Sequence, residues 1–128
     1  MNKTIVAAIM LALLAGTASA KTDVWGRFFP KLWKKEGGSK LHPKDGDNGK
    51  AIGPLQIWYV YWKDSGIKFG CYQDCRELWY AKLVVKSYMM RHAKRAVKRG
   101  DLKTMARIHN GGPKGHLKRA TLKYARSF

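Results

Sequence analysis

Apolar residues recur every three or four positions after Asp23, a spacing that places them on one face of a helix. Asp23 is a suitable N-cap, because its carboxylate accepts hydrogen bonds from the free N–H groups of a first turn. Pro30 interrupts the pattern, so the helix either bends at this residue or begins near it. Gly37 and Gly38 end the helix and leave Glu36 at its C-terminal edge. The apolar positions are Val24, Trp25, Phe28, Phe29, Leu32 and Trp33.

A polar loop over residues 39–50 separates this helix from the next apolar stretch. It contains His-Pro, Asp-Gly and Asp-Asn-Gly sequences, which favour turns. The apolar residues 51–57 then either pair as a short strand or lead into a helix. Residues 58–64 form a short aromatic helix that ends at Ser65-Gly66. Loops held by a rigid scaffold often carry binding and catalytic groups, so the polar loop is a candidate site.

The second half of the chain is helical by the same criterion. Residues 74–98 form the longest periodic stretch, with apolar residues on one face and lysine and arginine opposite. Asp101 caps a helix over residues 102–108, and Gly-Gly-Pro at 111–113 stops it. A last basic helix covers residues 117–126. We therefore expect a mainly α (α+β) domain of about five helices, with a small turn-and-strand region after the first helix.

The first twenty residues have the pattern of a signal peptide. Lys3 precedes an apolar run, and Ala18-Ser19-Ala20 matches a cleavage site. The run is too short to cross a bilayer as a stop-transfer helix. We expect cleavage after Ala20, a single domain over residues 21–128, and a secreted or periplasmic protein.

Two cysteines, Cys71 and Cys75, stand four positions apart. In an oxidising compartment such a pair is expected to form a disulfide. Because Cα atoms four apart on a regular helix lie near the limit for this bond, at least one cysteine should lie in a turn. Free thiols and an intermolecular bond remain alternatives. No second cluster of cysteine or histidine has ligand spacing, so neither a metal nor another cofactor is expected.

The chain is strongly basic, with 26 lysine and arginine residues against 8 aspartate and glutamate residues and a formal net charge of +18. Such a surface binds polyanions and accelerates association with them. Export disfavours intracellular nucleic acid, which leaves an anionic membrane or the anionic bacterial cell wall. The alternative is that the charge only keeps a small exported protein soluble.

The carboxylates indicate glycosidase chemistry. Glu36 and Glu77 are the only glutamates in the chain, and Glu36 lies one polar loop away from Asp47. Two carboxylates from different backbone elements can flank a glycosidic bond, one as acid and one as nucleophile or base. Each has a simpler interpretation: Glu36 as a solvated helix end, and Asp47 as a turn residue that bonds nearby backbone.

Three segments together resemble the invertebrate-type (destabilase-like) lysozymes and their bacterial relatives. They are Glu-Gly-Gly at 36–38 with Asp-Asn-Gly at 47–49 and Gly-Pro-Leu-Gln-Ile at 53–57; Tyr-Trp-Lys-Asp-Ser-Gly at 61–66; and Ala-Arg-Ile-His-Asn-Gly-Gly-Pro-Lys-Gly at 106–115 with Thr-Leu-Lys-Tyr at 121–124. They occur in the family's order and cover most of the chain after residue 20.

The resemblance implies a lysozyme-like fold and hydrolysis of the β-1,4 bond between N-acetylmuramic acid and N-acetylglucosamine. By position, Glu36 would be the general acid and Asp47 the second carboxylate. Gln56 would line the cleft near the acid, and His109 and Asn110 would form the opposite wall. Trp58, Tyr59 and Tyr61 follow the apolar strand and are candidates for stacking on a sugar ring, with burial in the core as the commoner alternative for aromatic residues.

The chain also departs from the family pattern. The family reads Glu-Ser-Gly-Gly, whereas Gly37 follows the glutamate here. Ile52, Ser65 and His116 stand where animal members carry cysteine, so the disulfide scaffold differs. The loop between the glutamate and the glutamine is slightly short, which makes Asp45 a rival for the second carboxylate.

A general acid active near neutral pH needs a raised pKa. Leu32 and Trp33 could provide an apolar wall that raises the pKa of Glu36, whereas Lys34 and Lys35 would lower it. The sequence does not say whether the pKa of Glu36 is raised or lowered. Besides a muramidase, two functions remain: a lytic transglycosylase that uses Glu36 alone, and a non-catalytic cationic protein that binds cell wall or membrane. We expect a monomer.

Overall fold

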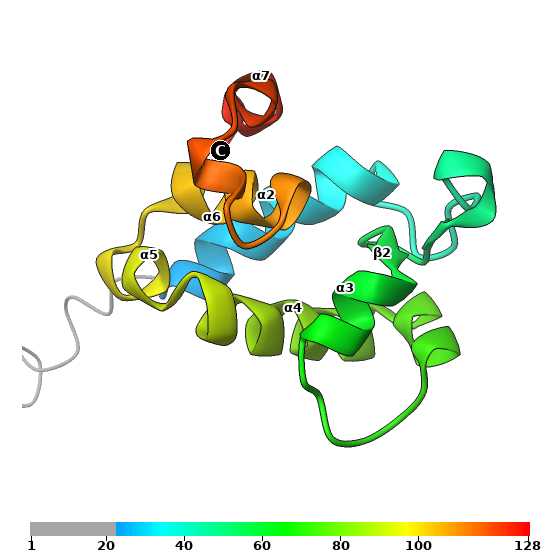
Figure 1. Ribbon diagram of the computed structural model, residues 1–128. Coiled ribbons are helices and arrows are strands. Elements are labelled where there is room, and N and C mark those ends of the chain that lie inside the picture. Colours follow the sequence, from blue (N-terminus) through cyan, green and yellow to red (C-terminus); the bar gives the residue numbers. More distant parts are fainter. Residues whose placement is uncertain (1–22) are drawn as a thin grey trace, which may run out of the picture.

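The computed structural model describes residues 23–128, and Figure 1 shows their arrangement. The predicted signal peptide over residues 1–20 lies outside the described residues, so export stays a prediction. Within residues 23–128, every helix is too short or too polar to cross a membrane.

The described chain is mostly helical with one small antiparallel hairpin, which confirms the expected mainly α (α+β) class. The α-helices are α2 (Val24–Gly37), α3 (Tyr59–Asp64), α4 (Leu78–His92), α5 (Lys94–Arg99), α6 (Leu102–Gly111) and α7 (Leu122–Ala125). The strands are β1 (Ala51–Ile52) and β2 (Ile57–Trp58). Short 3-10 helices complete the chain: η1 (Asp47–Gly49), η2 (Tyr72–Arg76), η3 (Gly115–Leu117) and η4 (Arg119–Thr121).

Helix α2 begins and ends where its capping residues predict. The Asp23 carboxylate accepts the Gly26 N–H at 2.8 Å, and Gly38 closes the helix in the left-handed region at φ 60°. The helix runs through Pro30 without interruption. A proline inside a helix costs about 3 kcal/mol, whereas burying a Phe or Leu side chain stabilises by about 1.5–3 kcal/mol each. Phe28, Phe29 and Leu32 all lie in the core, so their burial outweighs the proline.

Helix α4 supplies the largest share of the core and packs against α3, α5 and α6. The prediction of one long helix over residues 74–98 is wrong, because the chain forms η2, α4 and α5 there. Glu77 is extended before α4, and Ala93 leaves the helical region after it, at φ −135°. Ala93 and Ala96 are both buried, so the bend at Ala93 keeps α5 packed against the core. A straight continuation of α4 would carry these residues away from the core.

The prediction of a last helix over residues 117–126 is also wrong, since only α7 is α-helical there. Thr121 explains the difference. Its buried hydroxyl donates to the Gly115 carbonyl at 2.7 Å and lies 2.8 Å from the Lys118 carbonyl, and Arg107 donates to it at 2.9 Å. Side-chain bonds of this kind compete with the helical pattern of the backbone. The result is two 3-10 turns in place of the predicted helix.

The predicted disulfide between Cys71 and Cys75 is not formed, and both residues are free thiols. Cys75 is fully buried in the core, whereas Cys71 is exposed at the N-cap of η2. Their side chains therefore lie in different environments. The expectation that at least one of the two cysteines lies in a turn is confirmed, because both belong to the short turn of η2 and its N-cap. Burial above all, with the negative charges of Asp74 and Cys71, raises the pKa of the Cys75 thiol to about 12.

The hairpin of β1 and β2 places its turn against the end of α2, and it confirms the strand alternative for the apolar stretch after the polar loop. Gly37 is essential to this contact, because a Cβ atom there would lie 2.3 Å from the Pro54 carbonyl oxygen. A serine directly after Glu36 would not fit. The glycine that stands here in place of the family's serine is therefore suited to the close approach of the hairpin turn.

Candidate active site

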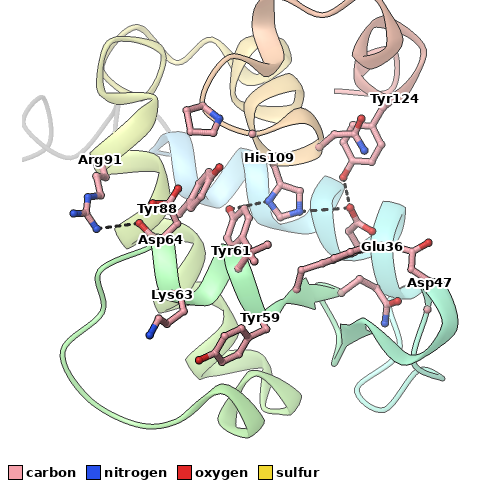
Figure 2. A pocket seen from close by; sticks show the side chains of 17 residues that line it. Glu36, Asp47, Tyr59, Tyr61, Lys63, Asp64, Tyr88, Arg91, His109 and Tyr124 are labelled. Carbon is pink, nitrogen blue, oxygen red and sulfur yellow. Dashed lines mark hydrogen bonds and ion pairs between the residues drawn. The ribbon is translucent and has the colours of Figure 1, made fainter.

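A cleft of about 1110 Å³ opens between α2, the hairpin, α3, α4 and the end of α6 (Figure 2). All six residues that the sequence singled out for catalysis or substrate binding line this one cleft. They are Glu36, Asp47, Gln56, Tyr61, His109 and Asn110. Residues up to 74 positions apart in sequence are thus brought to a single surface.

Glu36 lies in the last turn of α2, and its side chain is 20% exposed. Two groups converge on one of its oxygens: the Tyr124 hydroxyl donates to Oε1 at 2.5 Å, and Nε2 of His109 lies 3.5 Å from the same atom. Within residues 23–128, Oε2 has no hydrogen-bond partner. The carboxyl group is therefore held by Oε1 and keeps Oε2 for a proton or a ligand.

The surroundings of Glu36 lower its pKa. Burial is the largest single cause and raises the pKa, but the hydrogen bond and charge of His109, the Tyr124 hydroxyl and the charge of Lys35 together outweigh it. The structure therefore gives the direction of the Glu36 pKa shift, which the sequence left open. The lysine acts in the anticipated direction, but the main lowering comes from residues on α6 and α7. In the unliganded protein Glu36 is therefore a carboxylate at neutral pH.

His109 connects Glu36 to Tyr61. The histidine side chain is only 5% exposed, and the Tyr61 oxygen lies 2.9 Å from Nδ1. Burial raises the pKa of Tyr61 well above its usual value, with further contributions from Tyr88 and Glu36, so the phenol keeps its proton. With Tyr61 donating to Nδ1, a neutral His109 carries its own proton on Nε2, directed at Glu36. Tyr61 also stacks on Tyr88 at 3.7 Å between ring centres.

Asp47 lies in η1, with its backbone in the left-handed region at φ 47°. Its side chain does not bond the neighbouring backbone, which was the simpler interpretation of this residue. It accepts a hydrogen bond from the indole N–H of Trp58 at 3.2 Å. Because Trp58 belongs to β2, the hairpin orients this carboxylate at the edge of the cleft.

Asp45, the rival second carboxylate, does not line the cleft. Its two oxygens accept hydrogen bonds from Arg76 at 2.7 and 3.0 Å. The hydrogen bond from that guanidinium lowers the pKa of Asp45. Its charge is thus directed toward η2 and away from the site.

Gln56 lines the cleft while it also holds the loop. Its amide nitrogen donates to the Lys44 carbonyl at 3.2 Å and to the Gly53 carbonyl at 2.9 Å. These bonds tie the polar loop to the hairpin turn and so support η1. Asn110, in the last turn of α6, faces the cleft on the other side.

Sequence reasoning did not assign a role to Tyr124, although this residue makes the shortest contact to Glu36. It was part of a matching segment, but no local pattern indicates which distant residue a tyrosine hydroxyl reaches. Lys63 and Arg91 also line the cleft and were missed for the same reason. Their positions depend on how α3 and α4 pack.

The fold matches a solved lysozyme. The crystal structure of Aeromonas hydrophila PliI in complex with Meretrix lusoria lysozyme aligns with a TM-score of 0.67 and 30% sequence identity, covering 82% of this chain and 88% of that chain. The chain belongs to the invertebrate-type lysozyme family. The expected lysozyme-like fold is confirmed by the same alignment.

Sequence comparisons with bivalve lysozymes agree with this membership. The chain is 38% identical to lysozyme 1 of Crassostrea virginica over 69 residues, which cover 53% of this chain and 38% of that protein. It is 40% identical to the lysozyme of Meretrix lusoria over 75 residues, covering 58% and 62%. The matched part thus spans less than two thirds of the length of each of these two relatives. No family model matches the chain.

Proposed function

We propose that this family member is an exported muramidase that hydrolyses the β-1,4 bond between N-acetylmuramic acid and N-acetylglucosamine. The observation that carries the proposal is the placement of Glu36 and Asp47, on separate elements, along one cleft. A pair of carboxyl groups on either side of the scissile bond is what glycoside hydrolysis requires. The relatives' names, all lysozymes, support the same activity.

Glu36 is the proposed general acid. Its Oε2 donates a proton to the glycosidic oxygen, and the carboxylate that remains is stabilised at Oε1 by Tyr124 and His109. These donors make Glu36 a stronger acid, which favours the transfer. They also reduce the protonated fraction at neutral pH, so activity is expected to increase as the pH falls toward the lowered pKa of Glu36.

Asp47 is the proposed second carboxylate. It either attacks the anomeric carbon, forming a glycosyl-enzyme that water then hydrolyses, or stabilises the positive charge that develops there while water attacks that carbon. The indole N–H of Trp58 donates to Oδ2 of Asp47 at 3.2 Å, which leaves Oδ1 to act on the anomeric carbon. A transglycosylase would use Glu36 alone, and the position of Asp47 on the cleft favours the two-carboxylate reaction over it.

The basic surface is proposed to hold the enzyme on the anionic cell wall after export. The large excess of lysine and arginine over acidic residues, which gives the full sequence a net charge of +18, raises the local concentration of such a polyanion around the protein. The glycan strands are the proposed substrate, and neither a metal nor a cofactor takes part in this mechanism.

The proposal is tested with purified peptidoglycan and four proteins: the parent, Glu36→Gln, Asp47→Asn, and the matched control Asp45→Asn. We expect the parent and Asp45→Asn to lyse the substrate, and the other two to lose roughly 100-fold or more of the rate. Mass analysis of the fragments identifies the reaction. Reducing muramic acid ends support hydrolysis, and anhydro ends would show a transglycosylase. Equal lysis by the parent and Glu36→Gln would refute every catalytic role given to Glu36.

A further inference from the structure

The cleft continues beyond the carboxylates to a basic end. Figure 2 shows Lys63 and Arg91 on the opposite side of the cleft from Glu36 and Asp47. Lys63 belongs to the last turn of α3 and Arg91 to the last turn of α4. Cations are favoured at helix C-termini, but that preference does not require them to line the cleft.

The guanidinium of Arg91 has a defined place. Its Nη1 donates to the Asp64 carbonyl oxygen at 3.0 Å. Gly66 leaves room for it, because a Cβ atom at Gly66 would lie 2.6 Å from Nη1. Ser87 of α4 donates to the Ser65 carbonyl at 2.6 Å and so holds the turn after α3 against α4. One face of the guanidinium is thus anchored, and the remaining N–H groups are left for a ligand.

Neither cation is neutralised by the protein. Within residues 23–128, no carboxylate lies within ion-pair distance of Lys63 or Arg91. The nearby carboxylate of Asp64 lies against His92 instead, at 3.0 Å between Oδ2 and Nε2. The amine of Lys63 lies 6.0 Å from the centre of the Tyr59 ring, which also lines the cleft.

The substrate offers a partner for these charges. Sugar hydroxyl and N-acetyl groups are neutral, and the anionic groups of a peptidoglycan strand are the lactyl carboxylate of muramic acid and the carboxylates of the peptide attached to it. We infer that Lys63 and Arg91 form a subsite for a carboxylate of the muramoyl side chain, lactyl or peptide. This inference rests on the proposed function, and it predicts a preference for peptidoglycan over the neutral glycan chitin.

The test measures binding, so it does not depend on turnover. Binding is measured by calorimetry in a Glu36→Gln background, so that the ligands are not cleaved. Three tetrasaccharides are compared: a peptidoglycan fragment that carries its peptides, the same fragment with lactyl groups but without peptides, and chitotetraose, which has neither. Arg91→Gln and Lys63→Gln are compared with Arg95→Gln. Arg95 is exposed on α5 outside the cleft, so this control removes one charge without touching the subsite.

We expect Arg91→Gln to weaken binding of the peptide-bearing tetrasaccharide by about 10-fold, Lys63→Gln to weaken it less, and Arg95→Gln to leave it unchanged. Chitotetraose should bind all variants equally. If the peptide-free glycan shows the same loss, the lactyl group is the ligand; if it shows none, the peptide is. The subsite would be overturned if Arg91→Gln weakened binding of chitotetraose as much as binding of the peptide-bearing fragment, or if it weakened binding of no ligand.

Failure of the parent to cleave peptidoglycan would instead refute the proposed function. It would leave an Arg91-dependent binding result intact.

Discussion

The Tyr124 hydroxyl donates a hydrogen bond to Oε1 of Glu36 across 88 positions of sequence. This contact joins the C-terminal turn to the end of α2 and places a neutral donor beside the only glutamate in the cleft. Burial raises the pKa of Tyr124 far above its usual value, so the phenol stays protonated as a donor. The hydroxyl therefore favours the ionised form of Glu36 at every pH at which the protein is used.

Tyr124→Phe should shift the pH profile of activity to higher pH. The general acid works in its protonated form, so activity is lost as the pH rises through the lowered pKa of Glu36. Without the Tyr124 donor this pKa rises, and activity persists to higher pH. The measurement is kcat/KM against pH on soluble glycan fragments. Tyr59→Phe, which removes a hydroxyl from the same cleft without touching Glu36, should leave the alkaline limb in place, and a profile unchanged by Tyr124→Phe would contradict the role.

Trp58→Phe should reduce activity by roughly 3- to 10-fold, because Asp47 loses the donor that orients it. Phenylalanine retains an aromatic ring, and Trp58 is partly exposed, so packing of the hairpin changes little. Kinetics on peptidoglycan give the size of the effect, and Trp79→Phe serves as the control because Trp79 is exposed on α4 away from the cleft. Identical rates for both variants would show that the indole N–H does not position the carboxylate.

Gly37→Ser should destabilise the protein by about 1–3 kcal/mol, since its Cβ would overlap the Pro54 carbonyl and force the hairpin away from α2. Thermal unfolding would report a fall in Tm of several degrees. Gly38→Asn is the comparison: it lies in open space, and asparagine tolerates the left-handed conformation. A Gly37→Ser protein as stable as the parent would mean that the turn accommodates a side chain.

The two thiols should react at very different rates. Cys71 is exposed and should be labelled by a thiol reagent in the folded protein, whereas Cys75 is buried with a pKa of about 12 and should react only after unfolding. Titration of the folded protein should count one reactive thiol, and titration in denaturant should count two. Cys71→Ser should remove the thiol that reacts in the folded protein. Detection of no thiol in denaturant without a reductant would instead reveal the bonded pair.

Much of the fold follows from local signals. The Asp23 cap, the apolar spacing of α2 and the two glycines after Glu36 fixed the first helix, and Asp101 marked the beginning of α6. Caps and turn residues act over a few neighbouring positions, so sequence is sufficient for them. The predictions failed where distant contacts compete with local periodicity, as with the Thr121 hydroxyl that replaces the last helix by turns.

Local sequence was enough to predict the first helix, the beginning of α6, the polar loop and the residue types of the site, because helical spacing, turn chemistry and the family's motifs all lie within short segments. How those residues act depends on contacts between distant segments. The packing of these segments paired Asp45 with Arg76 and left Asp47 on the cleft, separated Cys71 from Cys75, and lowered the pKa of Glu36 through Tyr124 and His109. The physical reason is the same in each case. A side chain's charge and hydrogen bonds depend on which residues packing brings within a few ångströms, and those partners come from other parts of the chain.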